Sequence, residues 1–402
     1  MKRNPAVWLS LLLMLLPRAA FAQALPAGPV SAFDGQLGVG AEVVATIGDR
    51  DTSAFFNYTG YEHNVLRMFR VALSAAWRPV EPVAFVAEVR SEDLDQVRAY
   101  AAYIRLRPWR SRELDFQVGR IPPAFGSFGR RTYGTDNPLI GYPLAHQYLT
   151  SLRADAIPAT VNDLLEMRAR GWRTSYPVGS ASATPGLPLV SAFRWDTGVQ
   201  ARWREGIVEL SGAITAGTLS DPQVSDNNDG RQMSGRVAVF PATGLAIGGS
   251  VARGEWLDNL IVDLLPSDSP EYRQTALGAD FEYSRDYWLV RSELVWSRWR
   301  LPFAAIATDA NLDALGVWIE GRYRLTPRFF VAGRFDRLSF SEIAAETGEL
   351  VTWDAPVTRV EGTVGYYIQR NLVARAAVQH NDRDGGRILR RTYFSGQIAY
   401  WF

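Results

Sequence analysis

Charged side chains stand at every second position in several segments of this chain. In "LGVWIEGRYRL", Glu320, Arg322 and Arg324 share one parity, while Leu315 and Ile319 share the other. Carboxylates and guanidinium groups fixed in such rows suit the electrostatic selection of ions and polar solutes, and they need water or a partner on their side. The pattern therefore predicts a wetted charged face rather than a site that makes or breaks bonds.

The elements that carry these charges are expected to be β-strands. Strict alternation of apolar and polar residues recurs in "GQLGVGAEVVAT" and "LVARAAVQHN", which is typical of strands with one apolar and one polar face. We count about sixteen strands of roughly ten residues, the length that crosses a membrane. Links after even-numbered strands, such as "RPVEP", "REG" and "IQRN", are short, whereas most links after odd-numbered strands are longer. The sequence predicts an all-β fold, a transmembrane antiparallel β-barrel of about 16 strands, with aromatic residues at the strand ends.

The first residues predict export. Lys2 and Arg3 precede an apolar run, and Ala20-Phe21-Ala22 offers a small-residue cleavage site, so residues 1–22 are expected to be a signal peptide and residues 23–402 the barrel. Three of the 43 basic residues lie in this leader, which leaves 40 against 42 acidic residues and argues against a nucleic-acid partner. The chain has no Cys, so disulfides and thiolate metal sites are excluded, and no cofactor or metal is expected.

One connection is far longer than the rest. About seventy residues, 121–191, separate the strand "LDFQVGR" from the strand "FRWDTGVQARW". The segment is rich in aromatic and aliphatic residues, which need burial, so it is expected to be ordered and functional rather than a solvated tail.

The chain resembles the trimeric sixteen-stranded bacterial porins, in particular the branch that includes phosphate-selective porins. The residues that carry the resemblance are the leader, the terminal Phe402 and the stretches "VGRIPPAFG", "WDTGVQARW" and "GRVAVFPATGLAIGGS". It implies that the third loop, residues 121–191, folds into the lumen and forms a constriction, with carboxylates facing wall arginines. It also implies a homotrimer, although the short second loop, "SEDLDQ", lacks the length that clasps a neighbouring barrel.

The expected function is a water-filled outer-membrane channel for passive diffusion of small polar or charged solutes, anions among them. The expected partners are outer-membrane lipid, lipopolysaccharide and the barrel-assembly machinery, which would read Ile398, Tyr400 and Phe402 at the end of the last strand. The residues expected to line the pore or its constriction are Arg120, Arg130, Arg131, Asp136, Arg153, Asp155, Asp163, Glu166, Arg202, Arg291, Glu320, Arg322, Arg324 and Arg334. Tyr133, Tyr142 and Tyr148 would either stack on sugars or pin the loop to the wall.

Two other functions stay open. A lipid-modifying outer-membrane enzyme would need a nucleophile and a base, and the three histidines, His63, His146 and His380, lie in no G-x-S-x-G or H-E-x-x-H context. A structural or adhesin barrel without conductance could use its acidic loops, such as "LSDPQVSDNNDG", although their spacing matches no EF-hand.

Overall fold

The structure, a computed structural model, describes residues 30–32, 35–49, 64–192, 195–266, 270–384 and 391–402. The predicted signal peptide, residues 1–22, lies outside these ranges, as does His63. The main sheet has 17 strands, of which β1 (Val30–Ala32) pairs only with β2. The other sixteen close into an antiparallel barrel, which confirms the predicted fold class and strand number.

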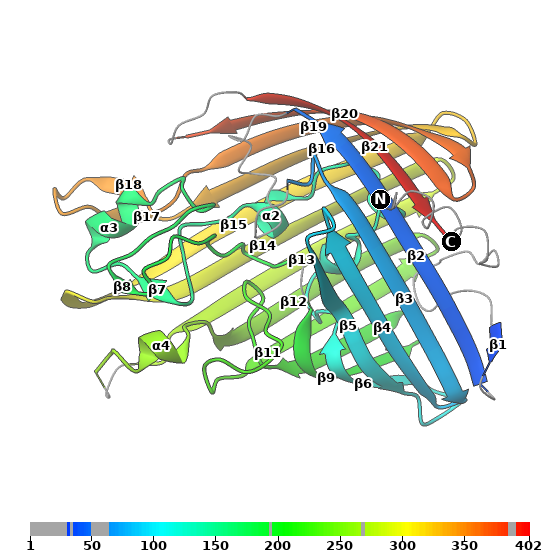
Figure 1. Cartoon of the computed structure of the whole chain (residues 1–402), viewed down its shortest axis with the longest axis horizontal. Coiled ribbons are helices and arrows are strands. Elements are labelled where there is room, and N and C mark those ends of the chain that lie inside the picture. Colours follow the sequence, from blue (N-terminus) through cyan, green and yellow to red (C-terminus); the bar gives the residue numbers. More distant parts are fainter. Residues whose placement is uncertain (1–29, 33–34, 50–63, 193–194, 267–269, 385–390) are drawn as a thin grey trace, which may run out of the picture.

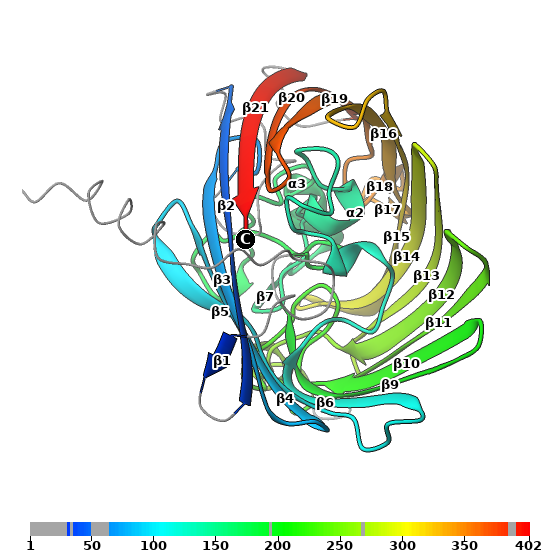
Figure 2. The same cartoon turned by 90° about the vertical axis from the view of Figure 1, so that its right-hand side faces the viewer.

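The sixteen strands follow one another around the ring in chain order. They are β2 (Gly35–Gly48), β3 (Phe69–Val80), β4 (Val83–Glu92), β5 (Gln96–Leu106), β6 (Glu113–Ile121), β9 (Asp196–Glu205), β10 (Val208–Thr215), β11 (Gln232–Ala242), β12 (Leu245–Glu255), β13 (Arg273–Arg285), β14 (Trp288–Phe303), β15 (Ile306–Arg324), β16 (Phe329–Phe340), β19 (Val357–Gln369), β20 (Leu372–Arg383) and β21 (Thr392–Trp401). The last strand pairs with the first, Ala45 with Ile398 and Glu42 with Trp401, so the sheet has no free edge (Figures 1 and 2).

The connections keep the predicted parity. Short turns join β3 to β4, β9 to β10, β11 to β12, β13 to β14 and β19 to β20, and most long connections lie at the opposite end. Within the expected long-link series, β4 and β5 are joined by residues 93–95 alone, where Asp93 and Leu94 have φ of 52° and 59°. Asp93 and Leu94 are the central residues of a tight turn that the Asp95 N–H closes onto the Glu92 carbonyl at 3.1 Å, and their left-handed backbone matches the twist of the two strands. Strand length departs from the expected ten residues, since β10 has 8 and β15 has 19.

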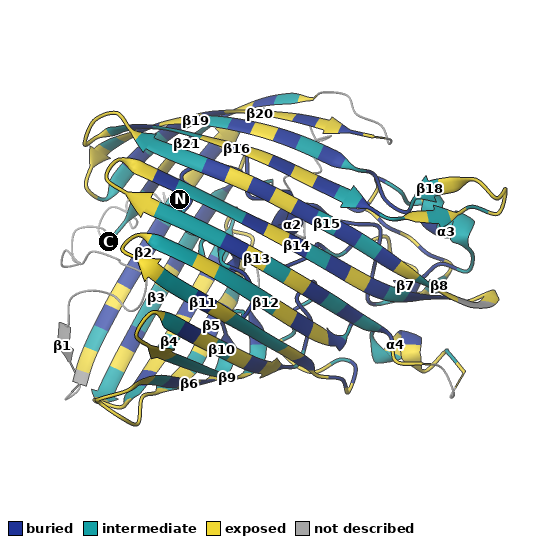
Figure 3. Ribbon diagram, turned by 180° about the vertical axis from the view of Figure 1, so that it is seen from behind, coloured by how far each residue is buried: buried dark blue, intermediate teal, exposed yellow. Residues whose placement is uncertain are grey.

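The two faces of the wall differ as the alternation predicts. Apolar side chains such as Leu277, Val360 and Ile398 are 49 to 53% exposed on the outer face. Glu42, Arg334 and Glu361, on the opposite parity, are 6% exposed or less. The alternating bands along the strands in Figure 3 show the same pattern. Exposed aromatic residues, Trp77 and Trp288 among them, stand at the short-turn end of the outer face.

The long segment between β6 and β9 carries short elements of its own. They are η2 (Phe128–Arg130), α2 (Leu144–Gln147), β7 (Ala156–Ile157), α3 (Val161–Glu166) and β8 (Val178–Gly179). Helix α2 contacts β15 and β16, and it is drawn inside the outline of the strand ring in Figure 2. Among the described residues, no helix combines the length and the hydropathy needed to cross a membrane.

The outer half of this segment packs into an apolar cluster beyond the ring. Leu152, Leu164 and Tyr176 join Trp299 and Trp353 of the extended strands and loops. Two further elements border the cluster: α4 (Asn259–Val262), and the hairpin of β17 (Glu342–Ala344) with β18 (Leu350–Thr352). The outer ends of the long strands β14 and β15 thus support the segment beyond the rest of the barrel wall.

Candidate functional site

A cavity of about 510 Å³ lies between one side of the barrel wall and the first part of the long segment. The wall side is formed by inward residues of β2 to β6 and β9 to β13, and the segment contributes residues from Pro122 to Asp136. The charged residues that line it are Glu42, Glu88, Arg105, Arg131, Asp136, Arg202, Arg204, Glu209, Arg236, Asp280 and Glu282. Six acidic and five basic groups give a lining that is close to neutral.

Most of these charges are paired within the protein. Arg202 pairs with Glu209, and Arg236 makes two bonds to Asp280, at 2.6 and 3.0 Å. Paired ions in a narrow aqueous path present dipoles rather than net charge to a passing solute.

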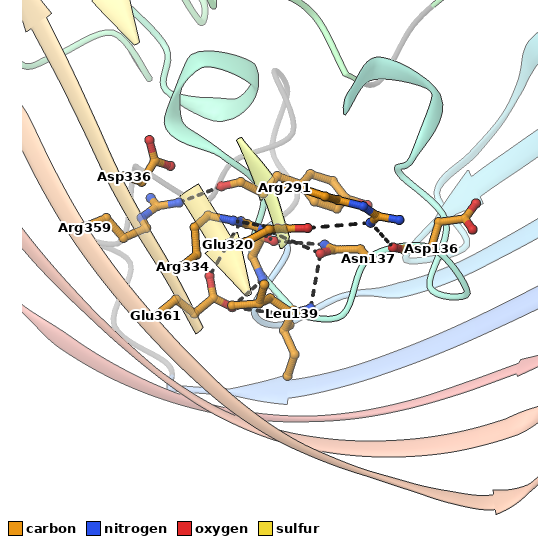
Figure 4. A network of polar contacts seen from close by, with 12 residues as sticks. Asp136, Asn137, Leu139, Arg291, Glu320, Arg334, Asp336, Arg359 and Glu361 are labelled. Carbon is orange, nitrogen blue, oxygen red and sulfur yellow. Dashed lines mark hydrogen bonds and ion pairs between the residues drawn. The ribbon is translucent and has the colours of Figure 1, made fainter. Parts of the chain in front are cut away.

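On the other side of the barrel, the long segment is fastened to inward side chains of β14, β16, β19 and β20 (Figure 4). Glu361 of β19 accepts the backbone N–H groups of Ile140 at 3.1 Å and Gly141 at 2.8 Å. Arg334 of β16 donates to the carbonyl of Gly141 at 3.0 Å and is bound to Glu320 at 2.8 Å. The side chains of Glu320, Arg334 and Glu361 are almost fully buried. Without these hydrogen bonds, each would be a polar group removed from water with no partner, which costs stability.

Further arginines bind carbonyl groups of the same segment. Arg291 donates to the carbonyl of Asp136 at 2.8 Å, and Arg359 donates to that of Tyr142 at 2.9 Å. Arg375 binds the carbonyl of Gly134. The guanidinium group suits this role because it keeps its charge and offers several donors in one plane.

Carboxylates fasten two more points of the segment. Asp336 accepts the N–H of Leu144 at 2.5 Å. Glu293 accepts the N–H of Ser127 at 2.8 Å and contacts Nε2 of His146 at 2.8 Å. The segment is therefore held by its backbone from residue 127 to residue 144.

Two glycines permit this close approach. A Cβ at Gly141 would meet the carboxylate of Glu361 and the amide of Gln379. A Cβ at Gly126, where φ is +61°, would meet the carboxylate of Glu293. Because glycine adopts this backbone freely and has no side chain, the segment can lie directly on the wall.

The outer half of the segment has its own anchor, Asp354, between β18 and β19. Its carboxylate accepts N–H groups of Ser151 at 2.7 Å and Ala169 at 2.9 Å, and the hydroxyl of Tyr148 at 3.1 Å. Burial raises the pKa of Asp354, and burial beside this carboxylate raises the pKa of Tyr148 well above its ordinary value.

The residues predicted to line the pore separate into three groups. Arg131, Asp136 and Arg202 line the cavity. Arg291, Glu320 and Arg334 form the network of Figure 4 that holds the segment. Arg120, Arg153, Asp155, Asp163, Glu166, Arg322 and Arg324 do not line the cavity.

The residues of the third group have other surroundings. Arg153 is buried and forms two bonds with Asp155, both 2.9 Å. Asp163 closes a capping box at the start of α3. Glu166 and Arg324 are exposed, Arg322 is half-buried, and Arg120 pairs in register with Ala102 and Thr197. The side chain of Arg130 lies outside the described residues.

All three tyrosines of the segment are hydrogen-bonded to side chains outside it, and sugar stacking stays a prediction. Tyr142 accepts from Arg70 at 2.7 Å, and Tyr148 binds Asp354, so both pin the segment. Tyr133 lines the cavity while its hydroxyl donates to Glu88 at 2.7 Å, and burial raises its pKa well above the ordinary value.

Several cavity residues were not among those predicted. Arg105, Tyr103 and Gln117 line it from β5 and β6, and Trp195 and Trp401 add aromatic surface. The alternation predicts that these strand residues point inward. It does not predict on which side of the barrel the segment leaves a cavity. His380, the remaining described histidine, faces outward and lies 2.8 Å from the hydroxyl of Thr392.

No protein-family model and no curated protein matches the sequence. Solved structures do match. OmpT, an outer membrane protein of Vibrio cholerae, has a TM-score of 0.56 at 10% identity over 94% of this chain and 100% of that chain. OmpF of Salmonella typhi in complex with daunomycin has a TM-score of 0.56 at 11% identity, over 92% of this chain and 98% of that one. An anion-selective porin from Comamonas acidovorans has a TM-score of 0.53 at 8% identity, covering 92% of this chain and 100% of the porin.

These likenesses concern the fold. Together with the closed sixteen-strand sheet, they define the sixteen-stranded porin fold predicted from the sequence. Identities near 10% carry neither a substrate nor the phosphate-selective branch over to this chain.

Proposed function

We propose that this protein is an outer-membrane porin, a channel through which small polar or charged solutes diffuse passively. The observation that carries the proposal is the closed barrel with an apolar outer face and a charged inner face that borders a 510 Å³ cavity. A sheet closed in this way satisfies its backbone hydrogen bonds within lipid. Water and solutes can then occupy the polar interior.

The long segment is proposed as the constriction. Its backbone bonds to inward groups of β14, β16, β19 and β20, with further bonds to Arg70 of β3 and Glu88 of β4, support a fixed position inside the barrel. The cavity that remains beside β2 to β6 and β9 to β13 is the proposed solute path. Arg131, Asp136 and Arg202 are the predicted constriction residues that border this path.

The cellular setting belongs to the same proposal. Residues 1–22 would direct export, and Ile398, Tyr400 and Phe402 would be read by the barrel-assembly machinery before insertion beside lipid and lipopolysaccharide. A homotrimer would have to use the outer faces of the strands, because the β4–β5 turn of three residues is too short to clasp a neighbour.

Planar-bilayer recording of the purified, refolded barrel tests the function. We expect stepwise insertions of an ohmic channel in KCl, and a small reversal potential in a KCl gradient because the cavity lining is nearly neutral. A folded barrel that inserts without ion current would refute the channel and leave the structural alternative. A lipid-hydrolase assay on the same sample separates the enzyme alternative.

A further inference from the structure

Arg105 is the cavity arginine whose charge is left unmatched. Within the described part of the chain it makes no hydrogen bond or ion pair, while Arg131, Arg202 and Arg236 each have a carboxylate partner. Arg204 lies 4.0 Å from Glu113 and over the ring of Phe240, near the short turn.

Asp115, two residues from the register partner of Arg105 on β6, is already occupied. Asp115 receives Nε of Arg107 at 2.7 Å and a terminal nitrogen of Arg107 at 2.9 Å. Such a bidentate pair uses the main acceptor sites of the carboxylate. Arg107 therefore keeps Asp115 away from Arg105, and the guanidinium of Arg105 is left facing the cavity.

Polar groups beside Arg105 also lack protein partners. Gln117 is the register neighbour of Arg105, and Gln200 is the register neighbour of Gln117 across β6 and β9. Oε1 of Gln117, both amide atoms of Gln200 and Nε1 of Trp195 are buried without a hydrogen-bond partner among the described residues, although the three side chains are only 3 to 9% exposed.

Aromatic rings border the same place. The Trp195 ring lies 6.5 Å from that of Tyr103 and 5.0 Å from that of Tyr100, and Trp195 and Tyr103 both line the cavity. Buried polar groups without partners are uncommon in folded proteins, and four such atoms belong to three residues of the wall that carries Arg105.

We infer that this wall of β5, β6 and β9 is a binding subsite for a small hydroxylated carboxylate. The inference rests on the proposed channel function and names a solute class for it. The carboxylate would take the planar donors of Arg105, while hydroxyl groups would exchange hydrogen bonds with Gln117 and the Trp195 N–H, which also line the cavity. A single unmatched cation fits one carboxylate better than a phosphate dianion, and the amide acceptors favour a solute that also donates.

Block of the KCl current by sodium gluconate tests the subsite, with sorbitol as the uncharged analogue and inorganic phosphate as the competing anion. Gluconate is expected to block the wild-type channel at lower concentration than sorbitol or phosphate. Arg105→Gln should raise the half-blocking concentration of gluconate about tenfold or more, since a charge-assisted pair is lost. Gln117→Leu should weaken block by gluconate and sorbitol alike.

Two further variants separate the site from the overall charge of the channel. Arg107→Gln removes no cavity residue but frees Asp115 to pair with Arg105, so it should also weaken gluconate block. Arg324→Gln removes an exposed arginine near a short turn and should leave block unchanged. Equal gluconate block in wild type and Arg105→Gln, or tighter block by phosphate, would overturn the inference.

Isothermal titration of the refolded barrel with gluconate gives a readout that needs no current. If the barrel conducts no ions but binds gluconate through Arg105, the channel proposal fails and the subsite stands. If it conducts and the titration shows no Arg105-dependent binding, the subsite fails and the channel stands.

Discussion

Replacing Glu361 with alanine is expected to loosen the long segment where it meets β19. The carboxylate holds the N–H groups of Ile140 and Gly141 at 3.1 and 2.8 Å and is 1% exposed. Arg334 would lose one nearby charge, at 4.0 Å, but would keep Glu320 at 2.8 Å. The loss is therefore centred on two hydrogen bonds to a charged acceptor.

The magnitude follows from those two bonds. Hydrogen bonds to charged groups contribute roughly 1.5 to 3 kcal/mol each, so local opening of residues 139–142 should become easier by about 3 to 6 kcal/mol. Since 1.4 kcal/mol is a factor of ten, amide exchange at Ile140 and Gly141 should accelerate by at least about a hundredfold. The barrel itself should remain folded, because its strand ladders do not involve the Glu361 side chain.

Hydrogen exchange read by mass spectrometry, together with single-channel noise, measures this effect. Glu361→Gln is the matched variant, because both N–H groups donate to Oε1 and the amide oxygen of Gln can still accept them without the charge. Its exchange should fall between wild type and alanine. Glu349→Ala, an exposed position in the β17–β18 hairpin, is the control for losing a carboxylate. Unchanged exchange at residues 139–142 in Glu361→Ala would show that the segment is held by something other than these bonds.

Three further outcomes are expected. Gly141→Ala should open the same contact, because the new methyl group has to displace the carboxylate below it, and exchange at residues 139–142 should rise as in Glu361→Ala. Deleting Phe402, which exchanges two backbone hydrogen bonds of 3.1 and 3.3 Å with Ala41, should lower the yield of heat-modifiable barrel in outer-membrane fractions, and an unchanged yield would refute an assembly role. Reversing Arg322 and Arg324 together to Glu should shift the reversal potential toward cations only modestly, since neither lines the cavity, whereas a shift as large as that of Arg202→Glu would move the constriction to the short-turn end.

The barrel was predictable because its rules are local in the sequence. Alternation determines which side chains point outward, so Ile398 and Gln397 could be assigned to opposite faces. The length of each link indicates the end of the barrel at which it lies. Strand length was less predictable. The outer parts of β14 and β15 keep the same alternation but pack on Trp353 and the long segment, and nothing in their own residues separates this support from a membrane crossing.

The site was predicted less well because its pairings join residues far apart in the chain. Asp136 and Arg291 were both named, but their contact runs through the carbonyl of Asp136 rather than its carboxylate. Arg153 and Asp155 carry the composition of a constriction, yet they bind each other outside the cavity, where Arg153 also donates to backbone carbonyls.

A count of inward charges is therefore a poor guide to ion selectivity in this barrel. Arg334, Arg359 and Arg375 are within 5% of full burial and donate to backbone carbonyls, so they meet the segment and not the solute. In the proposed channel, charges used in this way would fix its shape, while charges without a partner would determine its selectivity. On the cavity wall the clearest of these is Arg105, which has no partner among the described residues because Arg107 holds Asp115. Selectivity should thus depend more on a few substitutions around Asp115 than on the total number of arginines facing inward.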